Sequence, residues 1–213
     1  MTELDLLRLL QLADSALPIG ATAHSFGLEM LTAEEVVGTP QLLDLIRDYL
    51  AEAGLLEAVA CRAAFAGADF GAVNERLSAT KQARESRAAS MALGKRFLRL
   101  VFDVSGDPRL DRAGDIHSSA AFGLAGSVLN LGEEAVVAAC LRQMVAAMVS
   151  AAQRLLPLGQ TAASVMLWEL NAAIASVVER SRGISLDDAC SFTPMLDCAS
   201  MRHPGLGTRL FIS

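Results

Sequence analysis

Aromatic side chains are scarce in this chain of 213 residues. Phenylalanine, tyrosine and tryptophan together make up 5% of it, with a single Trp and a single Tyr. Nucleic-acid sites usually combine basic side chains with aromatic residues that stack on bases, and they carry recognisable motifs that are missing here. We therefore do not expect a nucleic-acid partner.

Cysteine and histidine are also few. The four cysteines form no C-x-x-C pair, and the three histidines stand far apart, so no pair has the spacing of metal ligands. Cys61 and Cys140 lie in apolar helical patterns, where a buried reduced thiol is the expected state. Cys198 and His203 could meet across a turn as a transient soft-metal contact, but we expect no metal site and no cofactor. Unpaired cysteines favour a cytoplasmic protein.

No long hydrophobic run is free of charge. Hydrophobic residues make up 53% of the chain and the mean hydropathy is +0.39. A membrane span needs about 20 apolar residues, and the best candidate, residues 135–152, carries Arg142 and Gln143 in its middle. The N-terminus has no basic region typical of a secretory signal. We therefore expect no membrane association, and we attribute the apolar excess to a homodimer or a lasting complex.

Nucleotide-binding motifs are missing as well. Gly94-Lys95 resembles the end of a P-loop, but Ala89 stands where the motif needs glycine and Arg96 where it needs a hydroxyl. No G-x-G-x-x-G is present.

The one pair that suggests catalysis is His24-Ser25. Adjacent residues on a helix point in different directions, and no third group is evident. An enzyme would require His24, Ser25, Glu29 and His117 to converge in one pocket. We keep this as an alternative, and we expect the protein not to be an enzyme.

Helical periodicity dominates what is present. In residues 134–156, apolar side chains recur at three- and four-residue steps, which places them on one face of a helix. They are Val137, Leu141, Met144, Met148, Ala152 and Leu155. Residues 160–182 are apolar nearly all round, which predicts a helix buried either within the core or between subunits. Pro157 should end the first of these helices, and Gly159 should supply an unusual backbone angle at the corner.

The remaining pattern predicts an all-α, single-domain helical bundle without strands. A capping box at Thr2 and Asp5 and a Thr39-Pro40 start signal open two of its helices. The predicted helices beyond the central pair span 2–13, 23–31, 39–63 with Gly54 as an interruption, 82–102 and 118–131, with one further turn at 186–190. Residues 1–193 form the predicted domain. Residues 194–213 show no helical period and form a predicted non-helical, extended C-terminal tail that binds a partner, with a tail folded over its own domain as the alternative.

Charge is unevenly distributed. The net charge is −6, yet residues 75–112 carry nine basic and five acidic side chains. The first interpretation of the basic segment 76–112 is a solvated helix face, and it is also the one place in the chain suited to an acidic partner. This leaves an alternative function, a helical regulatory protein that binds an acidic protein through this segment.

Four segments, taken in order, are more specific. They are 9–29, with LLQLADSALPIG followed by HSFGLE; 84–94, with RESR, Ser90 and Gly94; 157–160, PLGQ; and 194–211, with PMLDCASMRH followed by RLF. Together they resemble the urease accessory protein UreF family over nearly the whole chain. Gly207, Ile212 and the alanines at 120 and 121 depart from the family pattern.

The resemblance implies a dimeric, non-enzymatic chaperone of nickel insertion. UreF-like proteins bridge the scaffold protein UreD, called UreH in some organisms, and the GTPase UreG, and the assembly docks on apo-urease. By resemblance, the residues expected to bind partners are Pro18, His24, Ser25, Gly27, Glu29, Arg84, Arg87, Ser90, Gly94, Pro157, Gly159, Gln160, Asp197, Ser200, Met201, Arg202, His203, Arg209, Leu210 and Phe211.

Overall fold

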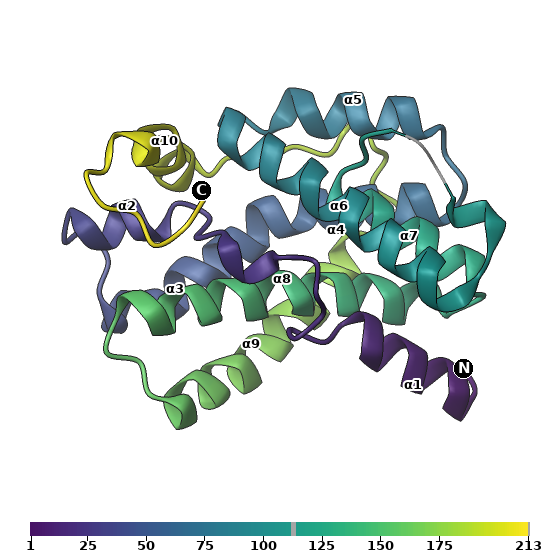
Figure 1. The fold of residues 1–213 in the computed structure, drawn as a ribbon, viewed down its shortest axis with the longest axis horizontal. Helices are drawn as coiled ribbons and strands as arrows, with labels where there is room; N and C mark the ends of the chain where they lie inside the picture. Colours follow the sequence, from purple (N-terminus) through teal and green to yellow (C-terminus); the bar gives the residue numbers. More distant parts are fainter. Residues whose placement is uncertain (112–113, 213) are drawn as a thin grey trace.

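The computed structural model describes residues 1–111 and 114–212, and in these ranges the protein is all-α, with no strand (Figure 1). The predicted fold class is confirmed. The α-helices are α1 (Glu3–Leu12), α2 (Leu28–Ala33), α3 (Thr39–Tyr49), α4 (Leu55–Phe65), α5 (Phe70–Thr80), α6 (Arg84–Ser105), α7 (Ser118–Val128), α8 (Glu133–Leu155), α9 (Gln160–Arg180) and α10 (Pro194–Arg202). The short turns of helix are η1 (Ala21–Ala23), the π-helical η2 (Leu50–Gly54), η3 (Pro108–Leu110) and η4 (His203–Gly205).

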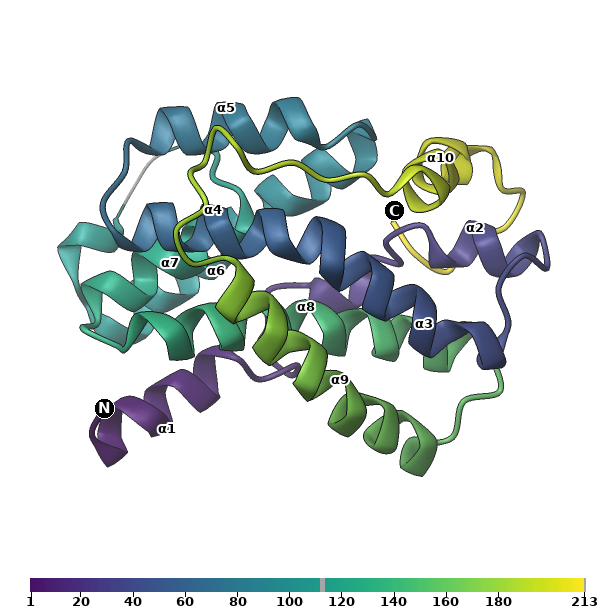
Figure 2. The same ribbon diagram turned by 180° about the vertical axis from the view of Figure 1, so that it is seen from behind.

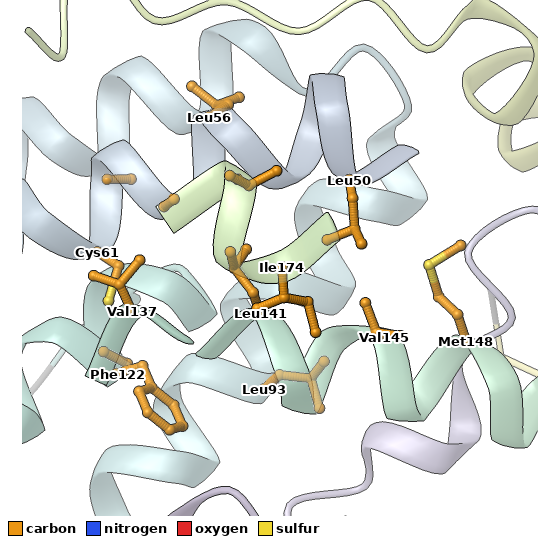
Figure 3. Packing of buried hydrophobic residues seen from close by; sticks show 14 of the residues in the cluster. Leu50, Leu56, Cys61, Leu93, Phe122, Val137, Leu141, Val145, Met148 and Ile174 are labelled. Carbon is orange, nitrogen blue, oxygen red and sulfur yellow. The ribbon is translucent and has the colours of Figure 1, made fainter. Parts of the chain in front are cut away.

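Helix α8 lies at the centre of the bundle and packs against α1, α2, α4, α7 and α9 (Figure 2). Val137, Leu141 and Met148 are fully buried on its inner face, as the periodicity predicted. Figure 3 shows Leu141 beside Ile174 and Val137 beside Cys61, all members of one buried cluster. Each buried side chain of this size stabilises the fold by about 1.5 to 3 kcal/mol.

Glycine residues let the helices approach closely. A Cβ atom at Gly123 of α7 would lie 2.1 Å from the carbonyl oxygen of Cys61 in α4. A Cβ atom at Gly94 of α6 would lie 2.0 Å from the carbonyl oxygen of Ile116. At both contacts a side chain would collide with backbone, which cannot move aside.

Helices α3 and α4 form one continuous rod rather than two helices separated at Gly54. The π-helical turn η2 joins them, so the glycine predicted to interrupt the helix only widens it. The rod begins as predicted next to Pro40, where Gln41 Oε1 accepts a hydrogen bond from the Gly38 amide at 3.1 Å.

Of the two surroundings expected for the second central helix, the core of this chain covers only one face. Trp168 of α9 is 80% exposed and Val165 is 53% exposed. By length and composition alone, α8 and α9 could each cross a membrane, but α8 is the core helix of this bundle and core helices commonly pass that test. The apolar outer face of α9 is left to be explained.

The prediction of a non-helical tail was also wrong over residues 194–202, which form α10. Pro194 occupies the first turn of this helix, where a missing amide hydrogen costs nothing. Leu196, Ala199 and Ser200 are buried, and α10 packs against α2. The short segment therefore gains its helix from tertiary contact, which no periodicity in 194–213 could reveal.

Two smaller predictions also differ from the structure. Gly159 has an ordinary φ of −68°, so it supplies no unusual backbone angle at the corner after Pro157. Residues 186–190 form a turn without helix, whereas residues 70–80, which no pattern singled out, form α5 with Asp69 as its cap.

Candidate functional site: a tail clamp and a central cavity

The carboxylate of Glu29 on α2 holds the C-terminal segment in place. It is bonded to His203 Nε2 at 2.6 Å and accepts hydrogen bonds from the backbone amides of Leu210 at 2.5 Å and Phe211 at 3.2 Å. Glu29 and His203 are buried. We call Gly27, Glu29, His203, Leu210 and Phe211 the tail clamp.

Gly27 shapes the same clamp through its backbone. Its φ of +86° lies in the left-handed region that favours glycine, and a Cβ atom there would lie 2.8 Å from the carbonyl oxygen of Leu196 in α10. Glycine at this position therefore both turns the chain into α2 and lets α10 approach.

Arg154 at the end of α8 closes the clamp from the other side. Its guanidinium lies 4.2 Å from the centre of the Phe211 ring and donates to the carbonyl oxygens of Thr22 and Leu210. The Ile212 amide donates to the carbonyl oxygen of Ala23 at 2.8 Å. Phe211 is only 4% exposed, so it anchors the end of the chain to the body.

A cavity of about 120 Å³ lies beside the clamp, between α4, α6, α7, α8 and α10. Its walls include Phe26 from the segment before α2, Ser90 from α6, and Asp197 and Ser200 from α10. Three of the four family-like segments therefore contribute to one enclosure, which we call the central cavity.

A buried ion pair lines this cavity. Lys81 Nζ is bonded to Glu57 Oε1. Burial opposes the ionisation of both groups, but their mutual attraction outweighs it, so the pKa of Glu57 is lowered and that of Lys81 is raised. Burial raises the pKa of nearby Tyr49 to about 12, which keeps its phenol neutral.

His117 forms a second buried polar group behind the cavity wall. Its ring nitrogens lie 3.0 Å from the hydroxyls of Ser90 and Ser78. Burial, and then the charge of Lys81, lower the pKa of His117 to about 4, so the ring is neutral at physiological pH. The close contact at Gly94 brings the backbone of residues 116–117 against α6 and so holds this network together.

The structure brings many predicted site residues together and leaves others apart. Gly27, Glu29, His203, Leu210 and Phe211 meet in the clamp, Ser90, Asp197 and Ser200 line the cavity, and His24 and Ser25 are buried in the segment just before α2. Pro157, Gly159 and Gln160 are exposed at the separate corner between α8 and α9.

The remaining predicted residues lie on the surface or support the backbone. Arg87 donates to the carbonyl oxygens of Lys81 and Gln82, and Arg202 pairs with Glu34 at 2.7 Å. Pro18, Arg84, Met201 and Arg209 are exposed. Within the basic segment 76–112, Arg84, Lys95 and Arg99 are exposed on α6, while residue 112 lies outside the described residues.

The arrangement does not favour the alternative of an enzyme. Glu29 is bonded to the tail, whereas the ring nitrogens of His117 lie 3.0 Å from two serine hydroxyls. Glu29 and His117 therefore belong to two separate hydrogen-bonded groups, whereas the enzyme alternative requires them in one pocket.

Metal ligands do not gather in the described residues, where no group of three or more His, Cys, Asp or Glu side chains could hold an ion. His203 is bonded to Glu29 while Cys198 is exposed. The neighbouring thiol of Cys61, together with burial, raises the pKa of Cys140 well above its usual value, and a protonated thiol is a poor ligand.

Sequence reasoning missed the ion pair. Glu57 and Lys81 lie outside the four family-like segments. The one available signal was a glutamate inside the apolar run of α4, because a carboxylate in a buried helix requires a partner.

Known proteins share sequence with nearly the whole chain. The family model described as UreF matches residues 36–171. The chain is 33% identical over 220 residues to the urease accessory protein UreF of Paenarthrobacter aurescens, covering 97% of each chain. It is 34% identical over 224 residues to the protein of the same name from Thermosynechococcus vestitus, covering all of both chains. The namesake from Corynebacterium glutamicum is 31% identical over 218 residues, with 96% of each chain covered.

Proposed function

The chain belongs to the UreF family of urease accessory proteins, and from that premise we propose that it is a non-enzymatic adaptor in urease maturation. In this role it bridges a UreD-like (UreH-like) scaffold protein and a UreG-like GTPase. The assembly docks on apo-urease, and GTP hydrolysis by the GTPase accompanies the insertion of nickel, which is cargo rather than a cofactor of this chain.

One observation carries the proposal: the family-like N-terminal and C-terminal segments contact each other. Glu29 accepts hydrogen bonds from the backbone amides of Leu210 and Phe211, and the ring of Phe211 is buried. Gly27 lets α10 approach the start of α2. The same segment exposes Met195, Met201, Leu210 and Ile212, each at least 45% exposed. An apolar surface displayed on a fixed backbone is typical of a protein-binding site. We assign it to the scaffold protein.

A pull-down with the scaffold protein tests this assignment. Met201→Asp together with Leu210→Asp places charges on the exposed face while the buried Phe211 and Glu29 remain. We expect this variant to lose the scaffold protein and to retain its helical circular dichroism. Val104→Asp is the matched control, because Val104 is 59% exposed near the end of α6, away from the tail. Equal recovery of the scaffold protein by both variants would refute the assignment.

The GTPase is assigned to the exposed cations of α6. Arg84, Lys95 and Arg99 lie on its outer surface, and Arg96 donates to the carbonyl oxygen of Ile19 next to Pro18. The same cations favour the second candidate function, a regulator that binds some other acidic protein. The double variant Arg99→Glu with Lys95→Glu distinguishes the adaptor from the regulator. If the protein is an adaptor, this variant should no longer bind the GTPase in a pull-down but should still bind the scaffold protein.

We also propose that the protein is a homodimer in the cytoplasm and has no membrane partner. Leu7 and Leu10 of α1 are 63% and 59% exposed, and Trp168 of α9 is 80% exposed. Both helices lie along the lower edge of the molecule, below α8, in Figures 1 and 2. A second copy that covers these side chains accounts for the high hydropathy without a membrane.

A further inference from the structure

A groove of about 850 Å³ lies between α5, α6 and residues 114–116. Its floor is apolar and includes Phe70, Leu98, Phe102 and Ile116. Leu98 and Ile116 are buried, whereas Phe70 and Phe102 are half-buried. Figure 1 shows α5 along the upper edge of the molecule, whereas α1 and α9 lie along the lower edge. The groove, which we call the α5–α6 groove, is therefore separate from the face assigned to the dimer.

Two of the elements that line this groove carry opposite charge. Lys95 and Arg99 come from α6, whereas Asp111 and Asp115 come from the chain that precedes α7. All four side chains are exposed. Lys95 and Arg99 are four residues apart, so they lie about 6 Å apart along the helix. The groove thus has an apolar floor between a basic and an acidic side.

Asn74 of α5 holds the acidic side in place. Its Nδ2 donates to the carbonyl oxygen of Asp115 at 2.8 Å, and its Oδ1 accepts a hydrogen bond from the amide of His117 at 3.0 Å. The bond to Asp115 uses only its backbone, and its carboxylate forms no ion pair with another described residue. The ammonium of Lys95 forms none with them either.

Arg99 is also available to a partner. Its guanidinium contacts the carboxylate of Asp103 on the same helix at 3.1 Å. Both side chains are exposed, and an exposed pair within one helix is weak. A carboxylate of another protein can therefore replace Asp103.

The structure of the groove restricts what can bind in it. A small-molecule site buries most of its ligand, but the charged side chains of this groove are exposed to solvent. The backbone groups of α5 and α6 are bonded within their own helices, so they offer no edge to an added strand. An apolar floor between charged sides is instead typical of a groove that binds an amphipathic helix.

We propose that the α5–α6 groove binds an amphipathic helix of the UreG-like GTPase. Apolar side chains of that helix cover Phe70 and Phe102, and carboxylates one turn apart on it pair with Lys95 and Arg99. A basic side chain on its opposite edge pairs with Asp115. This site depends on the proposed adaptor function, and it specifies the shape and the charge pattern of the segment that binds.

A change of charge at Asp115 distinguishes the groove from a simple basic patch. Asp115→Lys makes this side of the molecule more positive, so a partner attracted only by the cations of α6 would bind more tightly. In the groove the same change removes the group that pairs with the basic edge of the helix. We therefore expect the affinity for the GTPase to fall at least about tenfold. Biolayer interferometry with the immobilised full chain and the purified GTPase measures this affinity.

Glu75→Lys is the matched control, because Glu75 is an exposed carboxylate of α5 that does not line the groove. It makes the same change of charge, and we expect it to bind the GTPase at least as tightly as the unmodified chain. Asp115→Asn keeps the size of the side chain and should weaken binding even where Asp115→Lys fails to fold. Phe102→Ala removes part of the floor and should weaken binding while every charge is kept.

Unchanged or tighter binding by Asp115→Lys and Asp115→Asn would overturn the groove and leave the adaptor function standing. Equal weakening by Asp115→Lys and Glu75→Lys would also overturn it, because the effect would then depend on charge and not on position. If the unmodified chain binds no GTPase, either alone or with the scaffold protein, the adaptor function fails and the groove assignment fails with it.

Discussion

At the scale of single residues, Glu57, Lys81 and His117 are each held in one ionisation state by their surroundings. Glu57 and Lys81 stay charged because they neutralise each other, whereas His117 stays neutral because burial and the charge of Lys81 oppose its protonation. Arg87 opposes that protonation as well, and Glu57 only partly compensates.

His117 should therefore make stability depend on pH. The folded chain takes up this proton only near pH 4, whereas an unfolded histidine takes it up near pH 6.5. The lowered pKa of His117 stabilises the folded chain fully above pH 6.5. As the pH falls towards 4 the free energy of unfolding decreases by about 3 kcal/mol, because the unfolded chain binds the proton more tightly. Urea unfolding at pH 7 and pH 4 should show this loss in the unmodified chain. His117→Gln, which has no titrating ring, should lack it, and an identical pH dependence in both proteins would contradict the assignment.

Gly94 should be a packing residue rather than a partner contact. In Gly94→Ala the new Cβ atom would collide with the carbonyl oxygen of Ile116, and we expect a loss of about 3 kcal/mol in the free energy of unfolding. Gly159→Ala is the matched control, since Gly159 has an ordinary φ and open space around it. Its stability should stay within about 0.5 kcal/mol, because the entropic gain is offset by a poorer helix cap. Equal thermal midpoints in the two variants would exclude the packing role.

At the scale of elements, charged side chains connect helices that are distant in sequence. Arg62 of α4 donates to Glu133 and Glu134 of α8 and to the carbonyl oxygen of Val178 in α9. Arg62 and then Arg182 lower the pKa of Glu134 to about 2. The ends of three helices are thereby fixed together, at the opposite end of α8 from the tail clamp.

The tail clamp is the second connection of this kind. Glu29→Gln replaces a carboxylate that serves three nitrogen atoms with an amide that has one acceptor oxygen, so the end of the chain should detach. Hydrogen bonds to a charged group contribute about 1.5 to 3 kcal/mol. We therefore expect the amides of Leu210 and Phe211 to exchange with deuterium at least tenfold faster, while α8 is unchanged. The control Glu75→Gln should leave them as they are, and unchanged exchange in Glu29→Gln would show that the carboxylate does not hold the tail.

Helices with a long apolar period could be predicted from the sequence, and those formed by tertiary contact could not. The period in 134–156 identified the core face of α8, but α10 depends on Gly27 and on the surface of α2, which lie far away in sequence. The composition of α9 predicted burial because periodicity cannot distinguish a core from a face left open for another subunit. Likewise the ion pair of Glu57 and Lys81 could not be predicted from the sequence, because only the fold brings these two residues together.

At the scale of the whole molecule, an apolar surface remains open in addition to that of the C-terminal segment. Helices α1 and α9 lie along the lower edge of the molecule in Figure 1, pack against α8, and carry large exposed apolar side chains. Covering them in a dimer would leave the tail, on the opposite side of α8 in Figure 1, free for a different partner. The expected homodimer and the expected scaffold contact are thus compatible.

The dimer is tested by mass. Light scattering after size-exclusion chromatography should give twice the 22.4 kDa of the chain. Trp168→Ala combined with Leu7→Ala should give a monomer that remains helical, whereas Phe192→Ala, which removes an equally exposed aromatic elsewhere, should stay dimeric. A monomeric unmodified chain, or a dimer in all three proteins, would refute the assigned face.

The most direct test of the adaptor is whether two other proteins come together only when this chain is present. The UreD-like scaffold protein and the UreG-like GTPase from the same organism are mixed with and without it, and the masses of the eluted complexes are measured by light scattering. Our account predicts one complex that contains all three proteins, and no complex of the scaffold protein with the GTPase when this chain is omitted or carries Met201→Asp with Leu210→Asp. A scaffold–GTPase complex of the same stability without this chain would contradict it.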